Sequence, residues 1–193
     1  MMGPADPVYR PGVIPVPAPL RSGPAVVRAW AYDDLPCLEE AGQDQAIPPR
    51  TTVPSPFSQT AGRAFVERQW GRQASGEGLS VAIAEAATGA AAGLLSLLHR
   101  QQPGVVGAGY WIVASRRRRG LAGAALRVVS RWALGLPGVA RVEALVEPDN
   151  AGSIRVLEGA GFRREGLLRC YLAFGEIRRD AWIYSLIESD LQG

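Results

Sequence analysis

The stretch Arg117-Arg118-Arg119-Gly120-Leu121-Ala122 decides the fold of this chain, because it joins a strand to a helix through a glycine-bearing turn. Residues 109–114 are rich in bulky and β-branched side chains, which predicts a strand. Residues 123–129 carry apolar side chains at spacings of three and four, which predicts a helix. At such a helix start, free N–H groups point outward, the helix dipole adds positive charge and glycine admits a close approach. The stretch therefore predicts a binding site for a phosphorylated ligand.

Two common nucleotide motifs do not fit this turn. A P-loop needs two glycines five residues apart, followed by Lys and then Ser or Thr, and no such run is present. A dinucleotide fingerprint needs three glycines at fixed spacing, which Gly120 and Gly123 do not supply. The pattern that remains is Arg-x-x-Gly-x-Ala, at Arg117, Gly120 and Ala122.

A second segment follows after a helix-length interval. Residues 141–147 predict an apolar strand, which Pro148-Asp149-Asn150 ends. Asp149 or Asn150 then caps a short helix that finishes at a glycine. Residues 163–186 are typical of a closing antiparallel pair of strands.

Together these segments resemble the GNAT superfamily of acyl-CoA N-acyltransferases, in particular the branch that includes the ribosomal-protein-alanine acetyltransferases. The strong resemblance covers residues 109–186, and a weaker one extends back to about residue 26. It implies an α/β (α+β) fold with a mixed, largely antiparallel central sheet of about seven strands and about four helices. We expect the order β-α-α-β-β-β-α-β-α-β-β. The strands at 109–113 and 142–147 are the expected parallel pair, since a helix crosses between them.

Composition supports one globular domain. The chain has 193 residues, of which 47% are hydrophobic and 20% charged. We expect residues 1–24 to be a proline-rich, partly disordered extension and residues 25–193 a single domain. The uncharged run at 86–98 is too short to span a membrane. Cys37, Cys170 and the single histidine lack metal-ligand spacing, which favours a reduced, cytoplasmic protein without a metal site.

The resemblance implies transfer of an acetyl group from acetyl-CoA to a primary amine, which attacks the thioester directly in a ternary complex. The turn would hold the pyrophosphate, backbone N–H groups near Ile112 or Val113 would stabilise the oxyanion, and Asn150 would contact the pantetheine arm. Asn150 serving only as a helix cap remains open. The full predicted cofactor-binding set is Ile112, Val113, Arg117, Arg118, Arg119, Gly120, Leu121, Ala122, Gly123, Asn150 and Arg155.

Proton transfer is less constrained by the sequence. The resemblance suggests that Ser153 protonates the leaving thiolate, although a capping serine fits equally. Leu157 occupies a position where many family members carry a tyrosine, so a tyrosine acid is excluded there. Glu147 and Tyr171 are the candidates for accepting the amine proton, with His99 or a chain of water as alternatives. Glu147 as a plain surface charge is also open.

The loop at 46–57 and the helix beginning at Ser58 are expected to cover the acceptor pocket. A protein N-terminus, an aminoglycoside-like molecule or a small polyamine would fit it, and a homodimer is expected by analogy with relatives. Two other readings remain. One is a catalytically silent module that binds acyl-CoA. The other, driven by the arginines at 116–119, is a nucleic-acid or acidic-partner binder, which a net charge of only +3 makes less favoured.

Overall fold

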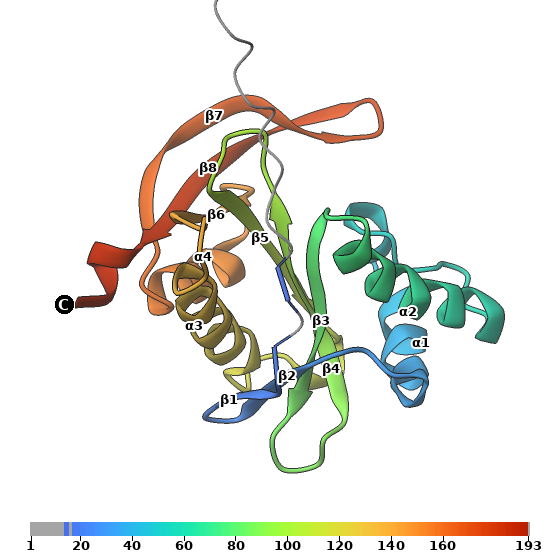
Figure 1. Ribbon diagram of the computed structural model, residues 1–193. Coiled ribbons are helices and arrows are strands. Elements are labelled where there is room, and N and C mark those ends of the chain that lie inside the picture. Colours follow the sequence, from blue (N-terminus) through green and yellow to red (C-terminus); the bar gives the residue numbers. More distant parts are fainter. Residues whose placement is uncertain (1–13, 16, 193) are drawn as a thin grey trace, which may run out of the picture.

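The computed structural model describes residues 14–15 and 17–192, and it is built around one eight-stranded sheet with helices on both faces (Figure 1). The strands lie in the order β1-β2-β3-β4-β5-β6-β8-β7. Their bounds are β1 Leu20–Ser22, β2 Ala25–Arg28, β3 Gly78–Glu85, β4 Ala91–His99, β5 Val105–Ile112, β6 Arg141–Val146, β7 Arg163–Phe174 and β8 Ile177–Ile187. All neighbouring strands are antiparallel except β5 and β6.

Four α-helices accompany the sheet in the described part of the chain: α1 Leu35–Gln43, α2 Gln59–Ala74, α3 Leu121–Leu134 and α4 Ala151–Gly159. Short 3-10 turns lie at Tyr32–Asp34, Pro48–Arg50, Ala114–Arg116 and Glu188–Gln192. In Figure 1, α1 and α2 lie on one side of the central strands and α3 and α4 on the other. The Ser58 side chain caps α2 by accepting a hydrogen bond from the Ala61 amide at 3.1 Å, which confirms the predicted helix start.

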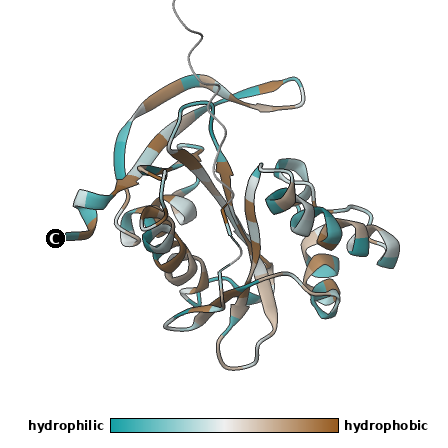
Figure 2. Cartoon of the chain, in the orientation of Figure 1, coloured by the Kyte–Doolittle hydropathy of each residue, from teal (hydrophilic) through white to brown (hydrophobic). Residues whose placement is uncertain are grey.

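Each face of the sheet buries its own core. On the α1–α2 face, Trp30 packs edge-on against Phe65, with ring centroids 5.6 Å apart. On the other face, the buried side of α3 runs through Leu121, Ala125 and Val129, which recur every four residues. Figure 2 shows hydrophobic colour concentrated on α3 and the central strands, and buried apolar clusters lie on both sides of the sheet.

The parallel strands β5 and β6 separate part of the way along their length. Their register runs only through three pairs and ends at Gly107 opposite Glu143. Beyond that point β5 stays paired with β4 up to Ile112, while β6 stays paired with β8 up to Val146. The centre of the sheet therefore opens between the carboxyl-terminal halves of these two strands.

The long β7–β8 hairpin bends over this opening (Figure 1). Its pairing shifts register between Leu168 and Leu172, and Cys170 within the shift has a φ of +51°. The register shift leaves the Cys170 amide without a partner in β8. This amide instead donates to Asp180 Oδ1 at 2.8 Å. Such bulges increase strand twist and redirect side chains.

The mixed α/β class with a largely antiparallel sheet is confirmed, and so is the parallel pair, but there are eight strands where about seven are predicted. The added strand is β1, which pairs with β2 and lies inside the segment 1–24 that the sequence suggests is a loose extension. Ile14 of the same segment is buried in the core. The expectation for residues 1–13 lies outside the described residues. Among the described helices, none has the length and hydropathy needed to cross a membrane.

A polar cluster ties β6, β7 and β8 together. Both terminal nitrogens of Arg141 donate to the Glu165 carboxylate, at 2.8 and 2.6 Å, and the Ser185 hydroxyl donates to the same group at 2.6 Å. The Arg141 hydrogen bonds, followed by the Ser185 hydrogen bond, lower the pKa of Glu165 to about 2. Because this pKa is depressed in the folded state, the stabilisation is complete above the unfolded pKa of about 4.3 and is lost as the pH falls through about 2.

We therefore expect Glu165→Gln to lower the free energy of unfolding at pH 7 by about 0.5–1 kcal/mol, a modest loss because the carboxylate is partly exposed. The difference in the free energy of unfolding between variant and wild type should be smaller at pH 3. At this pH, part of the Glu165 carboxylate is protonated in the wild-type protein and part of its stabilisation is lost. Urea unfolding at both pH values measures it, and Glu176→Gln at the exposed hairpin turn is the control. A deficit that grows on acidification contradicts the assignment.

Candidate active site

The Arg-x-x-Gly-x-Ala turn adopts the geometry of an anion-binding helix start. Gly120 is the N-cap of α3 with a φ of +75°, a conformation that favours glycine. Arg118, two residues earlier, also has a positive φ, of +64°. A Cβ built on Gly120 meets only the Pro24 side chain at 3.7 Å, so the space above the glycine is open. The first amides of α3 therefore face a space into which a phosphate group can approach closely.

Carboxylates hold three of the four arginines around this turn. Arg116 and Arg119 both pair with Glu85 at the end of β3, the latter at 2.8 Å. Arg117 pairs with Asp44 at 2.5 Å and also donates to the Ile112 carbonyl oxygen at 3.0 Å. Among the ion pairs of the described residues, none involves Arg118. Arg118 is thus the arginine of the block whose charge is available to a ligand.

A cavity of about 1300 Å³ passes through the opening between β5 and β6. It is lined from one face of the sheet by α3 and α4, and from the other by α2 and the loop before it. Most of the predicted site residues line it: Ile112, Arg117, Arg118, Gly120, Leu121, Ala122, Gly123, Glu147, Asn150, Ser153 and Arg155. A ligand in this cavity can reach from the arginine turn to the α2 side of the sheet.

The two backbone amides predicted as oxyanion donors face opposite ways. The Val113 N–H donates to the Ala92 carbonyl at 2.9 Å, so it is engaged with the β4 side and Val113 does not line the cavity. In an antiparallel pair, successive residues direct their backbone groups to opposite sides. The Ile112 amide therefore points toward the opening between β5 and β6. The structure leaves Ile112, and not Val113, as the candidate donor.

The first turn of α4 faces the same opening from β6. Asn150 caps the helix, because its Oδ1 accepts from the Ser153 amide at 3.0 Å, while its side-chain NH₂ remains for a ligand. The Tyr110 hydroxyl donates across the opening to the Ser153 carbonyl oxygen at 3.2 Å. Burial raises the pKa of Tyr110 to about 12, so this hydroxyl keeps its proton. Ser153 also lines the cavity.

Glu147 follows β6 and is buried rather than exposed on the surface, with 7% of its area accessible. Its Oε1 accepts from Arg50 Nε at 2.7 Å, and Arg179 Nε of β8 lies 3.8 Å from its other oxygen. The hydrogen bond to Glu147 raises the pKa of Arg50. A carboxylate therefore lines the cavity next to two guanidinium groups.

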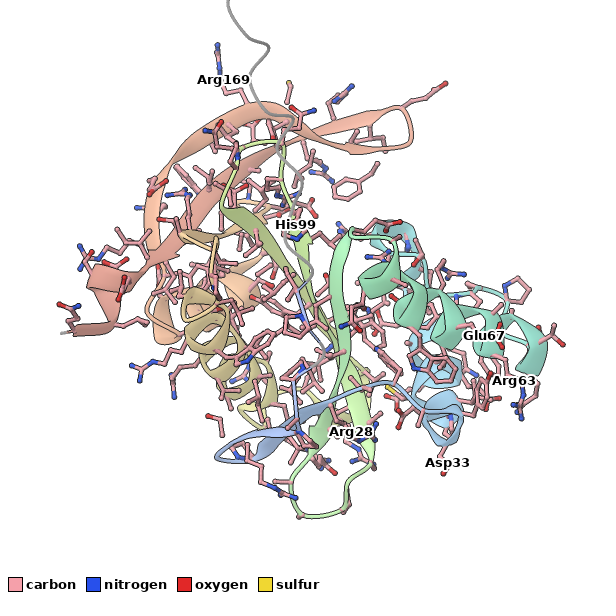
Figure 3. All side chains as sticks on the ribbon, in the orientation of Figure 1. Arg28, Asp33, Arg63, Glu67, His99 and Arg169 are labelled. Atoms are coloured by element: carbon pink, nitrogen blue, oxygen red, sulfur yellow. The ribbon has the colours of Figure 1, made fainter. Side chains whose placement is uncertain are left out.

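Tyr171 and Arg119, by contrast, do not line the cavity. Tyr171 is 55% exposed on the outer side of β7, whereas Leu172 and Phe174 line the cavity. Alternation along a strand places residues 172 and 174 on one face and 171 on the other. His99 ends β4 and is likewise absent from the cavity wall (Figure 3).

Several polar residues at the cavity wall have no catalytic or cofactor-binding role predicted from the sequence, among them the following three. Arg50 lies in the acceptor loop, Tyr110 in β5, and Gln69 in α2, where the Gln69 side chain is 3% exposed and donates to the Phe65 carbonyl at 2.9 Å. The sequence points to these residues only through their position in segments that are expected to border the pocket. In the described residues, no group of three or more His, Cys, Asp and Glu side chains is arranged to hold a metal ion.

A splayed parallel pair, a glycine turn and a cavity through the sheet agree with the family that the comparison with known proteins shows. The family model described as an acetyltransferase (GNAT) domain matches residues 25–163. The chain therefore belongs to the GNAT acetyltransferase family.

Among curated proteins, the chain is 33% identical over 82 residues to the probable N-acetyltransferase YjcK of Bacillus subtilis (strain 168). That match covers 42% of this chain and 45% of the relative, so the chain spans about half the length of the curated relatives it matches.

Solved structures match over most of the chain. Mycobacterium smegmatis RimJ, in complex with CoA-disulfide, superposes with a TM-score of 0.77 at 25% identity, covering 91% of this chain and 88% of that one. The ribosomal-protein-S5-alanine acetyltransferase from Vibrio fischeri superposes with a TM-score of 0.70, covering 90% and 98%, and at 16% identity it shows the fold alone. The neighbours thus include the ribosomal-protein acetyltransferases that the sequence resembles.

Substitutions at Asn150 separate its capping role from a ligand role. Asn150→Ala removes the acceptor for the Ser153 amide and should lower the free energy of unfolding by about 1 kcal/mol. Asn150→Asp keeps that acceptor and should leave stability nearly unchanged while removing the side-chain donor. Denaturant unfolding of both variants measures the difference. Equal losses in the two variants would show that the side-chain oxygen is not the stabilising group.

Proposed function

We propose that this protein transfers an acetyl group from acetyl-CoA to a primary amine. Family membership supports the reaction class, and the cavity through the sheet supports the arrangement of the two substrates. One observation supports the proposal most strongly: the same cavity runs from the Gly120 turn, past Ile112, to the part of the cavity that α2 lines. Such a path allows the thioester and the amine to meet from opposite faces of the sheet.

The residues present fit acetyl-CoA. The amides of Gly120, Leu121 and Ala122 at the start of α3 would hold the pyrophosphate, helped by the dipole of this helix and by Arg118. The Asn150 NH₂ group would contact the pantetheine arm, which would run along the exposed backbone edge of β5. Arg155 is exposed at the same wall and would neutralise a further phosphate.

Acetyl-CoA supplies an activated acetyl group, and the amine would attack its carbonyl carbon directly in a ternary complex. The C–N bond forms, the C–S bond breaks, and the electron pair of the broken bond leaves on the CoA sulfur. The Ile112 amide would stabilise the intermediate oxyanion, because it is fixed in the strand and points into the opening. The Ser153 hydroxyl would donate a proton to the sulfur and regain one from solvent water, while the nitrogen releases its own proton to a separate base.

The carboxylate of Glu147 would accept the proton from the amine, directly or through one water molecule. Glu147 lines the cavity on the acceptor side of the opening. Arg50 fixes the orientation of this carboxylate, because Arg50 Nε lies 2.7 Å from Glu147 Oε1. Tyr171, the other candidate from the sequence, lies on the outer face of β7 and takes no part in this arrangement.

We assign this reaction to the cytoplasm, since Cys37 and Cys170 form no disulfide. The acceptor is a protein N-terminus or a small molecule, and a homodimer remains a proposal by analogy with relatives.

Gly120→Glu should weaken acetyl-CoA binding by more than about tenfold, because it adds a Cβ where φ is +75° and places a negative charge beside the phosphate. Calorimetric titration measures the affinity. Gly89→Glu is the matched control: Gly89 has a φ of +74°, has nothing within 4 Å of a built Cβ and does not line this cavity. Equal affinity in the two variants would contradict the phosphate assignment.

Ser153→Ala should lower kcat by about a hundredfold with little change in acetyl-CoA affinity. The helix cap uses the Ser153 amide and not its hydroxyl, so the variant should also retain its stability. Steady-state release of the CoA thiol, measured with a saturating amine, gives kcat. A kcat equal to that of the wild-type protein would contradict the assignment of Ser153 as the proton donor.

A further inference from the structure

The half of the cavity on the α2 side forms a distinct acceptor chamber. Its walls are the loop after α1, the buried face of α2 and the bent end of β7, which contribute Ile47, Thr51, Phe65, Gln69, Leu172 and Phe174. Glu147 and the opening between β5 and β6 close its inner end. On the proposed function, the attacking amine sits in this chamber.

The charged groups of the acceptor chamber are predominantly guanidinium groups. Arg50 and Arg72 line it, and Arg179 reaches Glu147 from β8. The carboxylate of Glu147 contacts both Arg50 and Arg179, at 2.7 and 3.8 Å. The other carboxylate at the cavity wall, Asp149, also acts on Arg50, and its charge is a smaller cause of the raised pKa of Arg50 than Glu147 is. Three guanidinium groups thus stand against two carboxylates. The chamber therefore carries net positive charge.

Arg72 is the least satisfied of these groups. It lies near the end of α2 and is partly buried, and its Nε is buried without a hydrogen-bond partner in the described structure. No described carboxylate forms an ion pair with it. The terminal nitrogens of Arg72 likewise have no hydrogen bond to the described protein, and Arg72 lines the cavity. A partly buried guanidinium group without a carboxylate partner is unfavourable, so an anion bound by its terminal nitrogens would supply an interaction that the protein itself does not.

Arg50, at the same cavity wall, is held in place by two contacts. Its guanidinium carbon lies 5.3 Å from the centroid of the Phe174 ring, and its Nε is engaged by Glu147. The two terminal nitrogens of Arg50 have no hydrogen bond to the described protein. A stacked guanidinium with free terminal donors suits the planar, two-oxygen geometry of a carboxylate or phosphate.

We propose that the acceptor is an amine that carries an anionic group, a carboxylate or a phosphate, and that Arg50 and Arg72 bind this group. This inference rests on the proposed acetyl transfer and narrows its acceptor. Polyamines and aminoglycosides are excluded, because each would bring several positive charges into a chamber whose carboxylate already faces two guanidinium groups.

The same charges assist the chemistry. An ammonium group near guanidinium groups loses its proton more readily, because the neighbouring positive charges disfavour its charged form. Only the neutral amine attacks the thioester. The arginines thus recognise the anion of the acceptor and increase the reactive fraction of its amine.

The test compares acceptors that differ only in the anionic group, using acetyl-CoA and measuring release of the CoA thiol. The pairs are glycine with glycinamide and O-phosphoethanolamine with ethanolamine, and spermidine is the polycation. With rates corrected for the neutral fraction of each amine, we expect the anionic member of at least one pair to have a kcat/KM about tenfold higher. The pair that shows the preference identifies the anion as carboxylate or phosphate.

Variants then locate the charge. Arg72→Gln should reduce the preference for the anionic acceptor to within about twofold of unity, and Arg72→Lys should restore part of it. Arg169→Gln removes the same charge from the outer side of the β7–β8 hairpin, where Figure 3 shows Arg169 pointing away from the body of the protein, and should keep the full preference.

Two failures are distinguishable. The first failure is a rate of transfer to the neutral acceptors or to spermidine that equals or exceeds the rate to the anionic acceptors. This result overturns the inference about the acceptor and leaves the proposed function intact. Absence of transfer to every amine, in a protein that binds acetyl-CoA, overturns both. Loss of preference in Arg169→Gln as great as in Arg72→Gln would show that overall charge, and not the chamber, determines the effect.

Discussion

The early end of hydrogen bonding between β5 and β6 is the constraint on which the rest of the structure depends. After Gly107 the two central strands separate, which leaves backbone groups at the middle of the sheet without a strand partner. Unpaired backbone groups inside a protein are costly, so such an opening persists only where something else satisfies them. Tyr110 spans part of it through its bond to the Ser153 carbonyl. The amide groups of the pantetheine arm of the proposed cofactor could form hydrogen bonds with the remaining unpaired backbone groups, in the way that a neighbouring strand would.

Charge pairing gives the two ends of the cavity different characters. At the cofactor end, Glu85 and Asp44 pair with three arginines and thereby hold the turn in place, so the helix amides and Arg118 remain for phosphate. At the acceptor end, Glu147 pairs with two guanidinium groups, and Arg72 has no carboxylate partner among the described residues. The first arrangement supports a backbone anion site, and the second leaves positive charge available to a substrate.

Local features could be predicted from the sequence because their cause is local. The Gly120 turn, the Asn150 cap and the crossover between parallel strands each depend on residues close together in the chain. The ion pair of Arg50 with Glu147 joins residues 97 positions apart, and nothing in either segment specifies it. Leu172, and not Tyr171, faces the cavity because a bulge in β7 sets the register. The choice between the Ile112 and Val113 amides also stays open in the sequence, because the side to which an amide points depends on the pairing of β4 with β5.

The central claim is that the exposed edge of β5 and the start of α3 receive acetyl-CoA, and amide NMR spectra recorded during titration with acetyl-CoA test it most directly. The account predicts saturable shifts and slower hydrogen exchange at Ile112 and at residues 118–122, with Val113 unaffected in exchange because its N–H already pairs with Ala92. Shifts confined to the arginine side chains, reproduced equally by ADP or short DNA, would contradict it and indicate a general polyanion surface.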